Sequence, residues 1–197
     1  MKTITLITNS EILSLEDTVK LSKKLSRKGL NRIQIRERNI SHTSLTNFIK
    51  KMKDSIEESC ELFINGNLDL AIENNLNGVH FPEKYQINEY QNKENLILGR
   101  SIHENTDLNK HQKKFDYFHL GPIFLTQSHP NQNTIKEKNI SYISRKLSNV
   151  IFVGGININN VSKLLKYNFS GIAIMRELLL SRSPEKTFME LREKINE

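Results

Sequence analysis

Residues 150–156 read VIFVGGI, and this stretch decides the fold. Its four consecutive apolar residues leave no polar face, so a strand formed by them is buried on both sides. Two glycines follow at the point where the backbone turns or comes close to a ligand. Strands that are covered on both faces are typical of parallel sheets whose connections are helices.

Seven further runs of this kind occur, and segments of helical period separate them. The expected strands are 3–8, 32–37, 61–66, 78–81, 96–102, 117–124, 150–156 and 171–178. The expected helices run from near Ser14 to Gly29, from about His42 to Glu58, over 67–75, shortly after 81, up to about Lys114, and over 138–147, 159–168 and 183–195. Eight units of roughly 25 residues predict an α/β fold, a single (β/α)8 TIM barrel domain over residues 1–197. A doubly wound open sheet is the alternative, although such sheets usually have fewer strands.

The composition narrows the class of protein. The chain has 29 Lys and Arg against 22 Asp and Glu, and this net charge of +7 favours anionic partners. Few aromatic residues accompany the basic clusters, which argues against a nucleic-acid platform. The single Cys60 excludes an internal disulfide. Because neither a secretory signal nor an apolar run of membrane-spanning length is seen, we expect a cytoplasmic protein without membrane contact.

The active site of such a barrel is built from the loops that follow the strands. Polar residues or glycines at these positions are therefore the candidates for the site. They are Gln34, Arg36, Arg38, Asn65, His80, Ser101, His103, Thr126, Ser128, His129, Gly154, Gly155 and Arg176. Nearly all of them are groups that bind anions.

The second strand is the most informative part of this set. Its sequence alternates, and one face of RIQIRER at 32–38 holds Arg32, Gln34, Arg36 and Arg38. Arginines that point into a barrel mouth are costly without an anion, and a guanidinium group matches phosphate with two hydrogen bonds. The pattern predicts a phosphorylated ligand, and the alternative is an internal ion pair between Arg36 and a barrel carboxylate.

The last two strands point to a second anion site. Gly154 and Gly155 allow backbone amides to approach a phosphate, and barrels often bind phosphate at this place. A tight turn would use the same glycines, but Arg176 after the eighth strand favours phosphate. His80 and His103 are each either a structural residue or a base, and His119 is expected to be buried. No spacing of histidines and a carboxylate indicates a metal site.

Together these segments resemble the thiamine phosphate synthase and thiazole tautomerase (TenI-like) superfamily. The resemblance extends over the whole chain through LIT at 6–8, IQIRER at 33–38, ING and LDLA within 64–71, GVH at 78–80, LGRSIH at 98–103, DYFHLGPIFLT at 116–126, VGGI at 153–156 and GIAIM at 171–175. The TxSHP segment at 126–130, together with Arg176, is most similar to a branch in which this domain is fused behind a Nudix domain.

The resemblance implies an enzyme of thiamine biosynthesis that joins hydroxymethylpyrimidine diphosphate to thiazole phosphate and releases pyrophosphate. By this resemblance, the expected catalytic residues are Arg36, Arg38, Ser101 and His129. The expected substrate-binding residues are Gln34, Asn65, His103, Thr126, Ser128, Gly154, Gly155 and Arg176. The implied partners are small phosphorylated pyrimidine and thiazole ligands, and a homo-oligomer is left open.

The resemblance also implies Mg2+, but the sequence departs from the family at the expected ligands. Gly66 and Tyr85 stand where the synthase has two magnesium carboxylates, and Glu83 could offer one replacement oxygen. Both carboxylates are also missing in the tautomerase, but Pro122 stands where that enzyme has a histidine after its sixth strand. A tautomerase and a non-catalytic binder of thiazole phosphate or thiamine phosphate are therefore the alternatives to the synthase.

Overall fold

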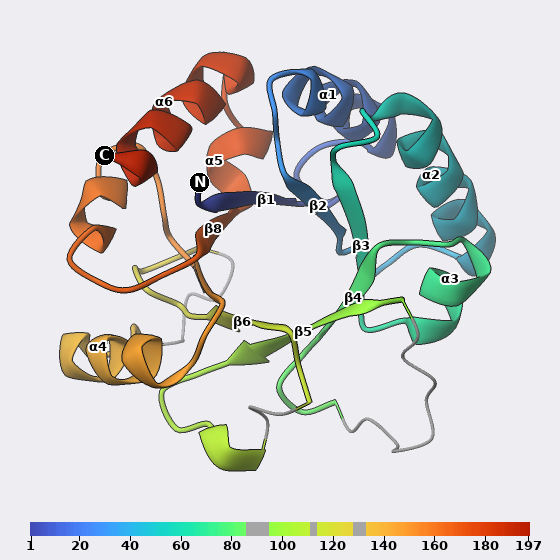
Figure 1. The fold of residues 1–197 in the computed structure, drawn as a ribbon. Coiled ribbons are helices and arrows are strands. Elements are labelled where there is room, and N and C mark those ends of the chain that lie inside the picture. Colours follow the sequence, from blue (N-terminus) through green and yellow to red (C-terminus); the bar gives the residue numbers. More distant parts are fainter. Residues whose placement is uncertain (86–94, 111–113, 128–132) are drawn as a thin grey trace.

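The structure is a computed structural model that describes residues 1–85, 95–110, 114–127 and 133–197. Eight parallel strands close into a barrel in chain order, and β1 pairs with β8. Figure 1 shows this ring of strands with the helices around it. The strands are β1 (Thr3–Ile7), β2 (Arg32–Ile35), β3 (Glu61–Asn65), β4 (Gly78–Phe81), β5 (Ile97–Ile102), β6 (Tyr117–Leu120), β7 (Val150–Val153) and β8 (Gly171–Ile174). The TIM barrel prediction is confirmed, and the open sheet is wrong.

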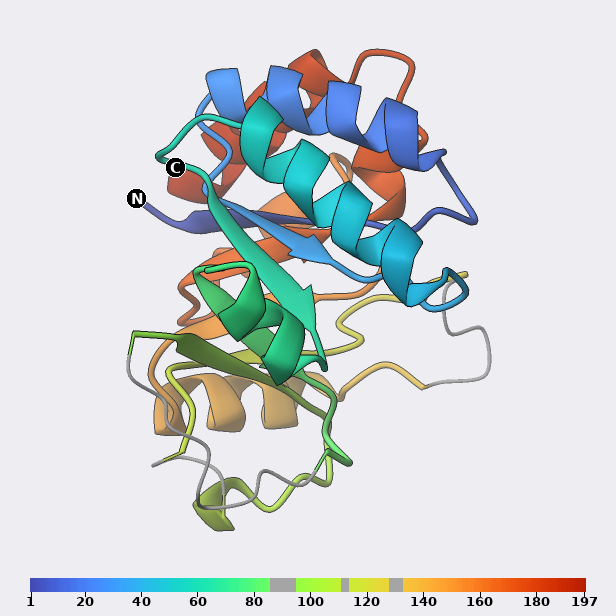
Figure 2. The same ribbon diagram turned by 90° about the vertical axis from the view of Figure 1, so that its right-hand side faces the viewer.

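The helices pack on the outside of the barrel through apolar faces. They are α1 (Leu15–Arg27), α2 (His42–Ser55), α3 (Leu68–Glu73), α4 (Glu137–Lys146), α5 (Arg176–Leu179) and α6 (Pro184–Asn196). Both views show α1 and α2 side by side (Figures 1 and 2). Ser14 caps α1, since its hydroxyl accepts a hydrogen bond from the backbone N–H of Asp17 at 3.1 Å. No helix in the described ranges is both long and apolar enough to cross a membrane.

Two expected helices are shorter than the sequence suggested. After β7 the chain forms only a 3-10 helix, η2 (Val161–Leu164), in place of a helix over 159–168. The Asn157 side chain accepts hydrogen bonds from the N–H groups of Asn159 and Asn160, and such local bonds compete with helix formation. After β5 the described residues contain a 3-10 turn, η1 (Leu108–Lys110), where Asp107 makes the same kind of bond to Asn109. The short helix expected after β4 lies mostly outside the described residues.

The strands β6, β7 and β8 end three or four residues earlier than expected, and each end opens a loop of the pocket. β6 stops at Leu120 because Pro122 has no N–H with which to continue the ladder. β7 stops at Val153 because Gly154 and Gly155 adopt positive φ angles of 96° and 65°. β8 stops at Ile174 because α5 begins two residues later.

The inside of the barrel has two different halves. Most side chains at the inward positions of β2 to β6 are polar, and Phe63 is an apolar exception. The polar ones are Arg32, Gln34, Glu61, Asn65, His80, Ser101, Tyr117 and His119. Inward positions of β7, β8 and the end of β1 carry apolar ones, namely Ile7, Ile151, Val153 and Ala173. We call these the polar half and the apolar half. The closed ring places them opposite one another around a single space.

Candidate active site

A pocket of about 690 Å³ opens at the C-terminal ends of the strands. The candidate residues for the site that line it are Gln34, Arg36, Arg38, Asn65, His80, Glu83, Ser101, His103, Thr126, Gly154, Gly155 and Arg176. The structure therefore brings together the residues that the sequence placed in seven separate loops. Ser128 and His129 lie outside the described residues, so their predicted roles stay predictions.

The arginines of the second strand fall into two groups. Arg36 and Arg38 lie beyond the end of β2 and line the pocket mouth, whereas Arg32 is buried inside the barrel. Arg32 pairs with Glu61 at 2.7 Å, so the internal ion pair considered for Arg36 belongs to Arg32. Within the described ranges no carboxylate forms an ion pair with Arg36 or Arg38. Arg36 and Arg38 therefore line the pocket as predicted, whereas Arg32, which shares their face of the strand, lies deeper and is paired inside the barrel.

A clamp between the first two loops holds Arg36 in place. The backbone N–H of Arg36 donates to the hydroxyl of Thr8 at 3.1 Å, and that hydroxyl donates to Glu37. The second oxygen of Glu37 accepts from the N–H of Ser10 at 2.7 Å. Burial, and then the positive charge of Arg38, lower the pKa of Arg36. Both effects disfavour the guanidinium charge, and an anion in the pocket would relieve them.

The polar half presents amide and hydroxyl groups to the pocket floor. Gln34 donates to the side-chain oxygen of Asn65 at 3.2 Å, and its own side-chain oxygen is buried without a partner in the described residues. The Nε2 atom of His80 lies 2.9 Å from the hydroxyl of Ser101. The ring of His119 packs against that of His80 with centroids 4.1 Å apart and an angle of 32° between the ring planes, and His119 is buried as expected.

Glu83 and His103 form one unit at the pocket rim. The Nδ1 atom of His103 lies 2.7 Å from a carboxylate oxygen of Glu83, and Thr106 donates to the other oxygen. Burial alone would raise the pKa of Glu83, but the bonds from Thr106 and His103 and the charges of His103 and Arg100 outweigh it and lower the pKa. The carboxylate is therefore ionised and already held by protein groups on both oxygens.

These residues do not fit a magnesium site. Over residues 1–85, 95–110, 114–127 and 133–197 no group of three histidine, cysteine or acidic side chains could hold a metal ion. Gly66 offers no side chain, Tyr85 offers a neutral phenol, and Glu83 is engaged as described above. Magnesium usually binds one or two carboxylates beside substrate phosphates. At the places where the family has its two carboxylates, the described residues supply only Glu83, whose two oxygens are already bonded to His103 and Thr106.

The apolar half meets the pocket through backbone groups. A Cβ atom on Gly155 would lie 2.3 Å from the backbone oxygen of Leu125, and one on Gly154 would lie 2.6 Å from Pro122. The backbone of Phe124 donates to the oxygen of Gly154 at 3.0 Å, so the loop after β7 supports the loop after β6. Both glycines are needed for this close approach, because any side chain would separate the two loops.

Arg176 joins the two ends of the pocket mouth. It is the first residue of α5, and its guanidinium donates to the side-chain oxygen of Gln127 at 3.0 Å. Arg36, Arg38 and Arg176 also line a neighbouring hollow of about 440 Å³ that shares this mouth. The pocket mouth therefore carries positive charge from two directions: Arg36 and Arg38 follow β2, and Arg176 follows β8.

Sequence reasoning missed Gln127, Tyr117 and the role of Arg32. The hydroxyl of Tyr117 lies 3.1 Å from Nδ1 of His80, a contact between residues 37 positions apart. Gln127 and Arg176 are 49 positions apart. The only local feature of the sequence that could have indicated Tyr117 is its place as the first residue of an expected strand.

Comparison with known proteins agrees with this geometry. Residues 4–178 match the family described as thiamine monophosphate synthase. A thiamine-phosphate synthase of Clostridium tetani is 30% identical over 201 residues, which cover 99% of this chain and 96% of that relative. One of Prochlorococcus marinus is 30% identical over 153 residues, 70% of this chain and 44% of that longer relative.

A solved structure supports the fold. The thiamine phosphate pyrophosphorylase of Pyrococcus furiosus superposes with a TM-score of 0.84 at 24% identity, covering 98% of this chain and 95% of that one. At this identity the likeness shows the barrel alone. The family match and the full-length relative decide the assignment, and the chain belongs to the thiamine monophosphate synthase family.

Proposed function

We propose that this chain is a transferase of thiamine biosynthesis that condenses hydroxymethylpyrimidine diphosphate with thiazole phosphate and releases pyrophosphate. Its full-length relative is named a thiamine-phosphate synthase. The observation that carries the proposal is the pocket of about 690 Å³, in which an arginine-rich wall faces a glycine loop. A pocket with two different anion-binding walls suits a reaction that has two phosphorylated substrates.

The polar half would hold the pyrimidine diphosphate. Arg36 and Arg38 lie at the mouth without a carboxylate partner in the described residues, and guanidinium groups bind phosphate oxygens with two hydrogen bonds. Ser101 would donate to the leaving oxygen, and Gln34 and Asn65 would bind the pyrimidine ring. Departure of the diphosphate leaves a pyrimidinylmethyl cation, so stabilising the leaving anion is the main task of this wall.

The apolar half would hold the thiazole phosphate. Gly154 and Gly155 keep the backbone open at the pocket wall, and Arg176 adds a positive charge beside them. Thr126 lies in the loop between the walls, where it can reach both ligands, and His103 lines the opposite rim. The thiazole nitrogen then attacks the cation directly, because both rings share one space and their orientation is set before reaction.

No step of this mechanism is assigned to magnesium, since the described residues do not supply its carboxylates. Arg36, Arg38 and the predicted cation His129 would carry part of the charge that a metal ion offers. We also propose that the chain belongs to the Nudix-fused branch and is located in the cytoplasm. A homo-oligomer is compatible with this proposal. Single-domain organisation over residues 1–197 belongs to it as well.

The experiment that tests the function is a product assay with both precursors and magnesium. We expect thiamine phosphate and inorganic diphosphate in equal amounts, measured by 31P NMR. If the thiazole isomer alone changes, the chain is a tautomerase, against which Pro122 at the place of its histidine argues. If ligands raise the melting temperature but no product forms, the chain is a binder, as the missing carboxylate pair would allow.

A further inference from the structure

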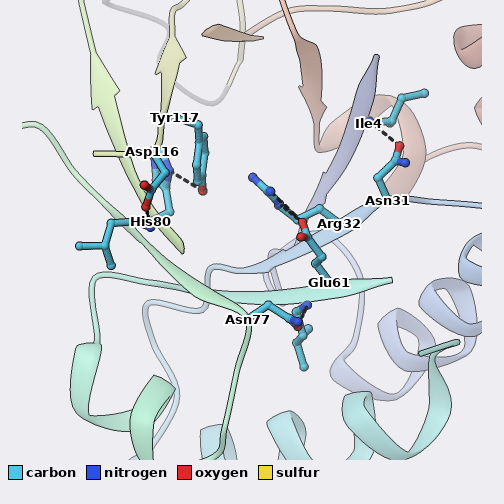
Figure 3. Close-up of polar contacts among 10 residues, drawn as sticks. Ile4, Asn31, Arg32, Glu61, Asn77, His80, Asp116 and Tyr117 are labelled. Carbon is cyan, nitrogen blue, oxygen red and sulfur yellow. Dashed lines mark hydrogen bonds and ion pairs between the residues drawn. The ribbon is translucent and has the colours of Figure 1, made fainter. Parts of the chain in front are cut away.

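A chain of polar contacts crosses the barrel from its N-terminal end to the pocket. Arg32 and Glu61, the first residues of β2 and β3, form an ion pair with two hydrogen bonds of 2.9 and 2.7 Å. The guanidinium of Arg32 lies 4.6 Å from the ring centroid of Tyr117. The Tyr117 hydroxyl lies 3.1 Å from Nδ1 of His80, and Nε2 of His80 lies 2.9 Å from Ser101 in the pocket wall. Figure 3 shows Arg32 beside Tyr117 and the contact of Tyr117 with His80.

Two glycines make room for this chain. A Cβ atom on Gly99 would lie 2.0 Å from the Cζ atom of Tyr117, and one on Gly78 would lie 2.4 Å from the ring of Phe63. Phe63 in turn covers Arg32, whose guanidinium carbon lies 4.0 Å from its ring centroid. Gly78 and Gly99 thus leave space inside the barrel for the rings of Phe63 and Tyr117, which lie against the guanidinium of Arg32.

The positive charge of Arg32 beside Tyr117 favours one direction of donation. A guanidinium group has donors and no acceptor, so the hydroxyl of Tyr117 turns its lone pairs toward Arg32 and its proton toward Nδ1 of His80. Burial raises the pKa of Tyr117, and that hydroxyl keeps its proton. Burial, followed by the charges of Arg32 and Arg36, lowers the pKa of His80 to about 3. A neutral imidazole that accepts at Nδ1 carries its proton on Nε2.

We propose that Arg32, Tyr117 and His80 are positioning residues that make Ser101 a hydrogen-bond donor into the pocket, aimed at an oxygen of the diphosphate. Because Nε2–H of His80 donates to the Ser101 oxygen, the serine keeps its own proton for the ligand. Without this chain, Ser101 could donate inward to His80 instead. No proton is transferred, and every group keeps its own. Only the naming of the anion as diphosphate rests on the proposed function.

The tautomer of His80 tests the proposal without any variant or ligand. In protein labelled with 15N at histidine, two-bond 15N–1H correlations distinguish the two neutral forms. We expect the Nε2–H form of His80 at pH 7. The Nδ1–H form would overturn the proposal, since Tyr117 would then accept and Ser101 would donate to His80. Arg32→Met should allow the Nδ1–H form to appear, because the cation no longer orients the phenol.

A double-mutant cycle with inorganic diphosphate as the probe tests the link to Ser101. Tyr117→Phe should weaken diphosphate binding about threefold to tenfold, the value of one hydrogen bond. In a Ser101→Ala background the same change should have no further effect. The exposed Tyr142→Phe is the control and should leave binding unchanged. Equal losses from Tyr117→Phe in both backgrounds would show a structural role only and overturn the proposal.

This cycle separates the proposal from the proposed function. Diphosphate binding and the His80 tautomer are measured without the thiazole ligand, whereas the function is judged by thiamine phosphate formation. If no thiamine phosphate forms but Tyr117→Phe weakens diphosphate binding only when Ser101 is present, the transferase function is rejected and the positioning of Ser101 is retained. If thiamine phosphate forms but Tyr117→Phe has the same effect on diphosphate binding with and without Ser101, the positioning of Ser101 is rejected and the transferase function is retained.

Discussion

The polar and the apolar halves of the barrel reach the same pocket by different means. In the polar half, Arg36 and Ser101 line the pocket, and each is held by a neighbouring side chain: Thr8 accepts from the backbone N–H of Arg36, and the Ser101 hydroxyl contacts His80. In the apolar half, Gly154 and Gly155 offer backbone, and their positions depend on close packing against the loop after β6. The polar half should therefore respond to changes of charge and protonation, and the apolar half to added side-chain volume.

The largest expected effect is a loss of stability in acid that comes from the polar half. Burial first, and then nearby positive charge, lowers the pKa of His80 to about 3, and burial lowers that of His119 as well. Both titrate near 6.5 in the unfolded chain, so below that pH the unfolded state binds more protons and stability falls. We expect a loss of about 3 kcal/mol in the free energy of unfolding between pH 6.5 and pH 5.

Urea unfolding at several pH values measures this slope. His119→Phe should remove about half of it, whereas the exposed His42→Gln should leave it unchanged. A slope that does not change in His119→Phe would mean that this histidine is not buried in its neutral form. Glu83, whose pKa is lowered from 4.5, adds a further loss only in stronger acid.

The second effect concerns volume inside the polar half. Gly99→Ala places a Cβ atom 2.0 Å from the Tyr117 ring, so the ring or the strand must move, at a cost of about 1–3 kcal/mol. Gly66→Ala is the matched comparison, because its nearest contact is 3.8 Å away and only its positive φ of 71° opposes the change. Thermal unfolding should rank Gly99→Ala as the more destabilising, and the reverse order would place Tyr117 elsewhere.

The third effect is the loss of one charge at the mouth of the apolar half. Arg176→Ala should weaken thiazole phosphate binding by about 1.5 kcal/mol, the value of a charge-assisted contact. Arg182→Ala is the control, since this exposed arginine does not line the pocket. Calorimetric titration gives both affinities, and an unchanged affinity in Arg176→Ala would place the anion elsewhere.

The smallest expected effect is a gain. Gly66→Asp with Tyr85→Asp restores the two carboxylates that the family implies, and the 3.8 Å contact at Gly66 leaves room for a side chain. Turnover at limiting magnesium should rise a few-fold, because the metal ion gains oxygen ligands. If the wild type is already fast at micromolar magnesium and the double variant gains nothing, the protein's own cations supply the charge.

Much of the fold could be predicted because it depends on local pattern. Apolar runs such as VIFV identify buried strands, and eight of them with helices between leave few architectures. The ends of elements could not be predicted as well. Side-chain bonds such as that of Asn157 to its neighbours, and the proline after β6, override the apolar pattern.

The candidate site divides in the same way. Arg36, Ser101 and Gly155 could be predicted because they follow strands, and a barrel brings all strand ends together. The buried ion pair of Arg32 could not be predicted, because alternation shows which face a residue shares and not how deep it lies. Its partner Glu61 is 29 positions away, and such a pairing depends on strand register, which no local pattern contains.

The central claim is that the two halves bind different anions, and crossed affinities test it most directly. Inorganic diphosphate and thiazole phosphate are titrated into the wild type, Arg36→Ala and Gly155→Ala. We expect Arg36→Ala to lose about tenfold or more for diphosphate and little for thiazole phosphate, and Gly155→Ala to show the opposite pattern. Equal losses for both ligands in both variants would contradict the division of the pocket.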